Sequence, residues 1–184
     1  MSRRHPLIPP HLWLLTDPRQ GAALWRALRR LPHGAGVVVR HYDLPAGERR
    51  AFFRRVRQQV HARGGQAVLA GPAAMASRWG ADGSYGDPGT ARRHRAGLRL
   101  APVHDRHEIR QAERRRADLL LLSPLFATRS HPGARGLGPL RFAGLARATQ
   151  RPVIALGGVS ARHEGLLRKI GAAGWAGIDA FAAG

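Results

Sequence analysis

Residues 117–138 read ADLLLLSPLFATRSHPGARGLG, and this stretch carries the clearest sign of how the chain folds. It opens with a continuously apolar run and then passes directly into a loop rich in hydroxyl and cationic side chains. A strand without alternating polar residues is covered on both faces, as the strands of a parallel sheet are. Loops after such strands carry the chemistry of α/β proteins, and hydroxyls together with cations suit a phosphate. The stretch therefore predicts an α/β fold with an anion-binding loop.

Short apolar segments of the same kind alternate with longer amphipathic segments along the whole chain. The predicted strands are residues 12–16, 36–40, 66–70, 82–85, 98–102, 118–123, 152–156 and 177–181. Eight strand and helix units most economically close into a compact (β/α)8 TIM barrel. An open, doubly wound sheet is the alternative.

Residues 46–62 illustrate the helical segments. Phe53, Val56 and Val60 fall on one face at helical spacing, and the arginines of the segment point elsewhere. The arginines expected on solvated faces here are Arg49, Arg50, Arg54 and Arg57.

Two further helices are predicted from the residues that cap them. Asp105 precedes a helix through Glu113, and Glu108 stands three residues after Asp105, as in a capping box. Ser160 has the same place before a helix, with Glu164 nearby.

The length and composition limit the class of protein. We expect an N-terminal extension over residues 1–11 and one barrel domain over residues 12–184, because 184 residues can bury a core of their own. The chain has no cysteine, which excludes disulfides, thiolate catalysis and cysteine-ligated zinc. No apolar run approaches the roughly 20 residues of a membrane span. We therefore expect a cytoplasmic protein that does not enter a membrane.

The net charge is +20, from 31 Lys and Arg against 11 Asp and Glu. Such a charge attracts polyanions, so an Arg-rich nucleic-acid binder is one alternative function. The arginines, however, spread over several helical segments, which is typical of solvated helix faces. The tryptophans, which are Trp13, Trp25, Trp79 and Trp175, are scattered and form no ladder for stacked bases. Both observations disfavour nucleic acid as a partner.

In a barrel, the functional groups lie directly after the strands. The candidates at these positions are Asp17, Arg40, His41, Tyr42, Asp87, His104, Thr128, Ser130, His131, Gly157 and Gly158. Paired glycines let backbone N–H groups approach a phosphate, and the guanidinium of Arg40 suits a bidentate phosphate contact. His104 is a candidate general acid or base because imidazole titrates near neutral pH. The structural alternatives are a rim ion pair for Arg40, a simple turn for the glycines and a helix-start residue for His104.

Eight segments, in this order, resemble the thiamine phosphate synthase and thiazole tautomerase superfamily. They are LWLLTD, GVVVRHYDL, GADG, VH, ADLLLLSPLFATRSH, GLGPL, PVIALGGV and GAAGWAGI. The resemblance covers the chain from about Leu12 to its end and implies a compact (β/α)8 barrel. In the synthase it implies the condensation of hydroxymethylpyrimidine pyrophosphate with thiazole phosphate. That reaction yields thiamine phosphate and releases pyrophosphate with the help of Mg2+.

The resemblance implies roles for the ligand-binding half of the site. Arg40 matches the arginine of the family's R-E-K motif, a pyrophosphate contact. Thr128 and Ser130 match its T-x-T pair, and Gly157 with Gly158 matches the glycine turn that holds thiazole phosphate.

The metal-binding half departs from the family pattern. Ala70-Gly71 stands where the family has Asn-Asp, and Asp87 is the one acid near the shortened motif after the fourth strand. Tyr42 replaces the lysine of R-E-K, and His131 replaces the lysine after T-x-T. Magnesium that bridges a pyrophosphate needs carboxylate oxygens, and Asp87 is the one candidate ligand. We therefore expect Mg2+ only if the synthase reaction is retained, and no cofactor otherwise.

Three functions stay open beside nucleic-acid binding. The first is a synthase-like transferase, and the second is a thiazole tautomerase that needs no metal and moves a proton through His104, which matches that branch's histidine. The third is a paralogue that binds the phosphate ligand without catalysis. All three predict a small phosphorylated thiazole or pyrimidine as the partner. Whether copies of the chain form a homo-oligomer is left open.

Overall fold

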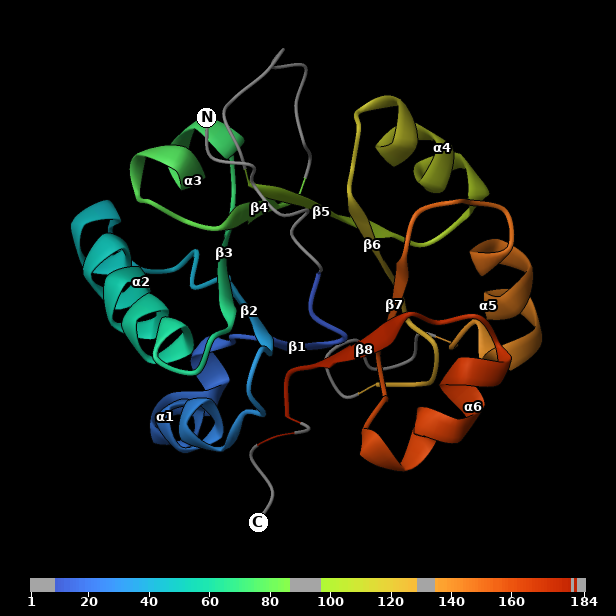
Figure 1. Cartoon of the computed structure of the whole chain (residues 1–184), viewed down its shortest axis with the longest axis horizontal. Coiled ribbons are helices and arrows are strands. Elements are labelled where there is room, and N and C mark those ends of the chain that lie inside the picture. Colours follow the sequence, from blue (N-terminus) through green and yellow to red (C-terminus); the bar gives the residue numbers. More distant parts are fainter. Residues whose placement is uncertain (1–8, 87–96, 129–134, 180, 182–184) are drawn as a thin grey trace.

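The computed structural model describes residues 9–86, 97–128, 135–179 and 181. Within them, parallel strands pair in sequence order and close into a barrel, as Figure 1 shows. The strands are β1 (Leu12–Leu15), β2 (Gly36–Val39), β3 (Gln66–Ala70), β4 (Gly83–Tyr85), β5 (Leu98–Val103), β6 (Leu119–Leu122), β7 (Val153–Leu156) and β8 (Gly174–Gly177). Because β1 pairs with both β2 and β8, the sheet has no free edge. The (β/α)8 barrel is confirmed, and the open sheet is wrong.

The helices surround the ring of strands (Figure 1). They are α1 (Gly21–Arg30), α2 (Ala46–His61), α3 (Ala73–Arg78), α4 (Arg106–Arg114), α5 (Gly138–Ala146) and α6 (Glu164–Lys169). Short 3-10 helices, Pro18–Gln20 and Ala161–His163, precede α1 and α6. None of the helices in the described segments is both long and apolar enough to cross a membrane.

Alternate residues of the strands face the barrel interior and the helices. The interior cluster contains strand residues alone: Trp13, Leu15, Val38, Val68, Ala70, Leu98, Leu100, Leu119, Leu121, Ile154 and Ala176. Two outer clusters pack the other strand residues against the helices, for example around Phe53 of α2 and Phe142 of α5. Both faces of the sheet are therefore buried, which explains the continuously apolar strands.

Glycine at position 36 lets the largest interior side chain fit. The side chain of Trp13 fills the space in which a Cβ at position 36 would stand. Its indole Nε1 donates to the carbonyl of Pro10 at 2.7 Å, so the buried N–H has a partner.

The eighth strand is the one that we predicted in the wrong place. It covers Gly174–Gly177, ahead of the predicted residues 177–181. The segment consists mostly of alanine and glycine, so apolar character does not mark the strand. The structure instead selects Gly174, whose missing Cβ leaves room for the carbonyl of His11, and Trp175, whose N–H donates to that carbonyl at 2.8 Å. Ile178 consequently lies after the strand, at the mouth of the barrel.

The helix expected over residues 46–62 is confirmed as α2, and Phe53, Val56 and Val60 are buried. Arg49 contradicts the expectation of a solvated side chain, because it is 8% exposed. Its polar contacts, described below, replace the water that it would otherwise bind.

The caps are partly as predicted. Asp105 caps α4, and its Oδ1 accepts from the N–H of Glu108 at 2.8 Å. The Glu108 carboxylate does not complete a capping box but binds His104. Ser160 pairs with His163 and not with Glu164, since its N–H donates to the imidazole Nδ1 at 3.1 Å.

Candidate functional site

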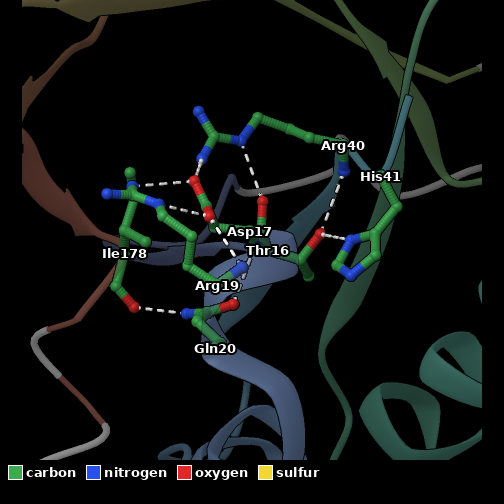
Figure 2. Close-up of polar contacts among 7 residues, drawn as sticks. All are labelled: Thr16, Asp17, Arg19, Gln20, Arg40, His41 and Ile178. Atoms are coloured by element: carbon green, nitrogen blue, oxygen red, sulfur yellow. Dashed lines mark hydrogen bonds and ion pairs between the residues drawn. The ribbon is translucent and has the colours of Figure 1, made fainter. Parts of the chain in front are cut away.

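The carboxyl ends of the parallel strands meet at one rim, and the turns after β1 and β2 carry a connected set of polar side chains there. Figure 2 shows Asp17, Arg19 and Arg40 converging on this rim. Chain segments 12–20 and 36–41 meet because β1 and β2 are neighbours in the barrel. Groups that are far apart in the sequence thus form one cluster.

Two guanidinium groups hold the carboxylate of Asp17 (Figure 2). Arg19 donates from Nε to Oδ1 at 2.8 Å and from Nη2 to Oδ2 at 3.0 Å, and Arg40 donates from Nη2 to Oδ2 at 3.0 Å. These contacts, led by the side-chain hydrogen bonds from Arg19, lower the pKa of Asp17 to about 2. Two cations share one carboxylate, so the cluster has a net positive charge that favours an anionic ligand.

Arg40 is fixed from the β1 side. Its backbone N–H donates to the hydroxyl of Thr16 at 3.0 Å, and its Nε donates to the Thr16 carbonyl at 2.9 Å. The side chain of Arg40 stays 24% exposed. The guanidinium is therefore oriented while part of it faces solvent at the rim.

Thr16 also bonds to His41. Its Oγ1 lies 2.9 Å from Nδ1 of the imidazole, which packs on the ring of Phe52 at 4.1 Å between centroids. Burial lowers the pKa of His41, so the neutral imidazole accepts from the Thr16 hydroxyl at neutral pH. The φ of His41 is +21°, a strained value for a residue other than glycine, and such strain concentrates at functional sites.

Gln20 ties this cluster to the end of β8. Its Oε1 accepts from the N–H of Asp17 at 2.8 Å, and its Nε2 donates to the carbonyl of Ile178 (Figure 2). Sequence reasoning missed Gln20, although the spacing Asp-x-x-Gln is a capping pattern that could have indicated it.

The turns after β6 and β7 lie side by side on the same rim. The N–H of Phe126 donates to the carbonyl of Gly157 at 3.1 Å, and both Gly157 and Gly158 have positive φ. A Cβ at Gly158 would stand 2.7 Å from the carbonyl oxygen of Ala127, next to half-buried Thr128. The structure thus brings Thr128 and the paired glycines together through backbone contacts that only glycine permits.

His104 follows β5 and turns toward α4. Its Nδ1 and its backbone N–H lie 2.8 Å and 2.7 Å from Oε2 of Glu108. The two side chains line a hollow together with Gly86, Pro102 and Arg115. The imidazole is half exposed, so solvent or a ligand can reach it.

Other candidates are more isolated or not described. Tyr42 is exposed, with its ring over the guanidinium of Arg49 at 4.9 Å. Asp87, Ser130 and His131 lie outside the described residues.

The described residues do not fit a magnesium ion. Ala70-Gly71 supplies no side-chain oxygen after β3, and Asp17 is already held by two guanidiniums. Nowhere in residues 9–86, 97–128, 135–179 and 181 do three acidic, histidine or cysteine side chains gather as a metal site requires. Magnesium in proteins is held by carboxylates, so this donor set supports no metal-dependent step.

Comparisons with solved structures show the same fold. A thiamine phosphate pyrophosphorylase from Pyrococcus furiosus superposes with a TM-score of 0.77 at 23% identity, covering 94% of this chain and 87% of that one. FabK from Thermotoga maritima superposes with a TM-score of 0.75 at 15% identity, covering 95% of this chain and 59% of that one. These identities are low, and the likenesses concern the barrel alone.

Sequence comparisons are more specific. The Aquifex aeolicus protein named "Putative thiamine-phosphate synthase 2" is 37% identical over 79 residues, which are 43% of this chain and 42% of that protein. The matched part therefore spans less than half of either chain. The family description "Thiamine monophosphate synthase" matches residues 12–181, which include every strand of the barrel and both sides of its rim. The chain belongs to the thiamine monophosphate synthase family.

Proposed function

We propose that this chain binds a phosphorylated thiazole and a pyrimidine pyrophosphate at the rim of the barrel and joins them to thiamine phosphate. The observation that carries the proposal is the arrangement of Arg40 and Arg19 around the single carboxylate of Asp17. A partly exposed, pre-oriented guanidinium is suited to the leaving pyrophosphate, whose negative charge grows during the reaction.

The reaction forms one bond and breaks one. The thiazole nitrogen attacks the methylene carbon of the pyrimidine, a C–N bond forms, and the C–O bond to pyrophosphate breaks with its electron pair on the leaving oxygen. Arg40 is the residue proposed to stabilise that oxygen, in keeping with its match to the R-E-K arginine. Because the described residues offer no magnesium site, no step here depends on Mg2+.

The opposite side of the rim is proposed to hold the thiazole phosphate. Thr128 supplies a hydroxyl, and the backbone N–H groups at Gly157 and Gly158 are donors that suit phosphate oxygens. Ser130 and His131 remain candidate contacts of the same ligand. Tyr42 is a candidate for the pyrimidine side.

A second function is supported by the pair of His104 and Glu108. A carboxylate at 2.8 Å from Nδ1 fixes the imidazole and leaves Nε2 as the atom that exchanges a proton. This arrangement suits a thiazole phosphate tautomerase that needs no metal. Exchanging His104 for Ala then lowers the rate of tautomerisation, whereas His107→Ala, an exposed change on the same helix, does not.

The deciding experiment mixes both substrates with the purified protein and measures thiamine phosphate, with added Mg2+ and with EDTA. We expect product, and Arg40→Met should weaken pyrophosphate binding about tenfold or more, as the loss of a charged hydrogen-bond donor does. Arg50→Met, an exposed arginine of α2, is the matched control. A protein that forms no thiamine phosphate under either condition contradicts the transferase. Tautomerisation by the same sample would then favour the second function.

A further inference from the structure

Arg49 differs from the other arginines of α2. It is 8% exposed, whereas its neighbour Arg50 and also Arg54, one turn further on, lie on the exposed surface. A guanidinium is costly to remove from water, so its burial needs compensating contacts. Those contacts indicate what the residue does.

The contacts of Arg49 are with the ends of two strands. Its Nη2 donates to the carbonyl of Arg40 at 2.8 Å and to the carbonyl of Ala70 at 2.5 Å. These carbonyls follow β2 and end β3, at the point where each strand passes into a rim loop. A helix side chain therefore joins two adjacent strand ends.

Aromatic rings complete the surroundings of the guanidinium. Its carbon lies 4.9 Å from the ring centroid of Tyr42 and 5.9 Å from that of Trp79, within the range of cation–π attraction. Among the carboxylates of the described residues, none lies within 4 Å of Arg49 as an ion pair. Its buried Nε has no hydrogen-bond partner there. The group is thus held by carbonyl dipoles and rings and not by an acid.

Arg40 is consequently held on both sides of its peptide unit. Thr16 accepts from its N–H on the β1 side, and Arg49 donates to its carbonyl on the α2 side. This double attachment limits the directions that the Arg40 side chain can take at the rim.

We propose that Arg49 is a positioning residue, which fixes residues 40–42 and thereby orients the guanidinium of Arg40 toward the phosphate ligand. The inference rests on the proposed function for the choice of ligand. Arg49 does not touch the ligand and acts through Arg40. A lysine at this place could reach a carbonyl but could not present a planar cation to both carbonyls and the two rings.

The test compares Arg49→Met and Arg49→Lys with the wild type, and Arg50→Met serves as the matched surface control. Amide hydrogen exchange of residues 40–43 reports the attachment directly, without any ligand. We expect Arg49→Met to speed this exchange about tenfold to a hundredfold, the loss expected for one or two bonds from a charged donor. Calorimetry with inorganic pyrophosphate should show an affinity about tenfold weaker in the same variant. Arg49→Lys should lie between the two, and Arg50→Met should match the wild type.

The outcomes separate the two proposals. Unchanged exchange of residues 40–43 in Arg49→Met overturns the inference, and so does faster exchange with unchanged pyrophosphate affinity. A wild-type protein that does not bind pyrophosphate contradicts the proposed function, and exchange alone then decides whether Arg49 holds the segment. If Arg49→Met does not fold, the same two measurements on Arg49→Lys decide, with faster exchange and weaker binding as the supporting result.

Discussion

The two sides of the barrel rim are built by different means. On the β1 and β2 side, charged side chains converge, with Asp17 held by Arg19 and Arg40. On the β6 and β7 side, the backbone of Gly157 and Gly158 packs against the preceding loop, and side chains contribute little. A side-chain cluster loses its contacts one by one when it is mutated, whereas a backbone cradle is blocked by a single added carbon. The two sides should therefore respond very differently to substitution.

The largest effect is expected on the backbone side, from Gly158→Val. Residue 158 has a φ of +65°, and its Cβ would lie 2.7 Å from the Ala127 carbonyl oxygen. We expect the free energy of unfolding to fall by about 2–5 kcal/mol, from the strain of a branched residue at positive φ and from overpacking. Chemical denaturation measures this change, and binding of thiazole phosphate should be lost with it.

Gly144→Ala is the control for that change. Gly144 lies in α5, and a Cβ there would meet nothing within 4 Å, so alanine should stabilise the helix by about 0.5–1 kcal/mol. If Gly158→Val were as stable as the wild type and still bound the phosphate, the backbone cradle would be disproved.

Much of the fold could be predicted because a parallel barrel buries both faces of each strand and so produces continuous apolar runs such as residues 119–122. The eighth strand was misplaced because its small residues carry no such signal. There the fit of Gly174 against the chain before β1 decides the strand, and that contact is tertiary.

The site could be predicted in the same uneven way. Arg40 and the paired glycines are found by their places directly after strands. Arg49 and Gln20 act from helices, and no local pattern distinguishes buried Arg49 from exposed Arg50 beside it. Only the meeting of α2 with the ends of β2 and β3 gives Arg49 its role.

A smaller effect is expected on the side-chain side, from Asp17→Asn. The guanidinium contacts lower the pKa of Asp17 from 3.8 to about 2. A carboxyl group with a lowered pKa stabilises the folded state above its unfolded value, and the contribution disappears as the pH falls through the folded value. We expect the variant to lose about 1 kcal/mol of stability at neutral pH, a modest value for a pair near solvent.

Denaturation of the wild type and the variant at several pH values tests this directly. The difference between them should be constant above pH 3.8 and shrink as the pH approaches about 2. Asp43→Asn, which changes an exposed carboxylate after β2, should show no comparable loss. A difference that persists at the lowest pH would mean that the charge of Asp17 is not what stabilises the rim.

The smallest effect concerns His41 and sharpens the comparison within the side-chain cluster. Burial is the main cause that lowers its pKa, Arg40 and Arg49 act in the same direction, and Asp43 and Asp17 oppose them. Nuclear magnetic resonance should show the imidazole titrating below 6.5, the ordinary value for histidine. A group with this shift destabilises the folded state when it is protonated, so stability falls as the pH falls below 6.5, and His41→Gln should lack that part of the loss. A midpoint above 6.5 would mean that the carboxylates outweigh burial, and Thr16 would then accept from a charged imidazole.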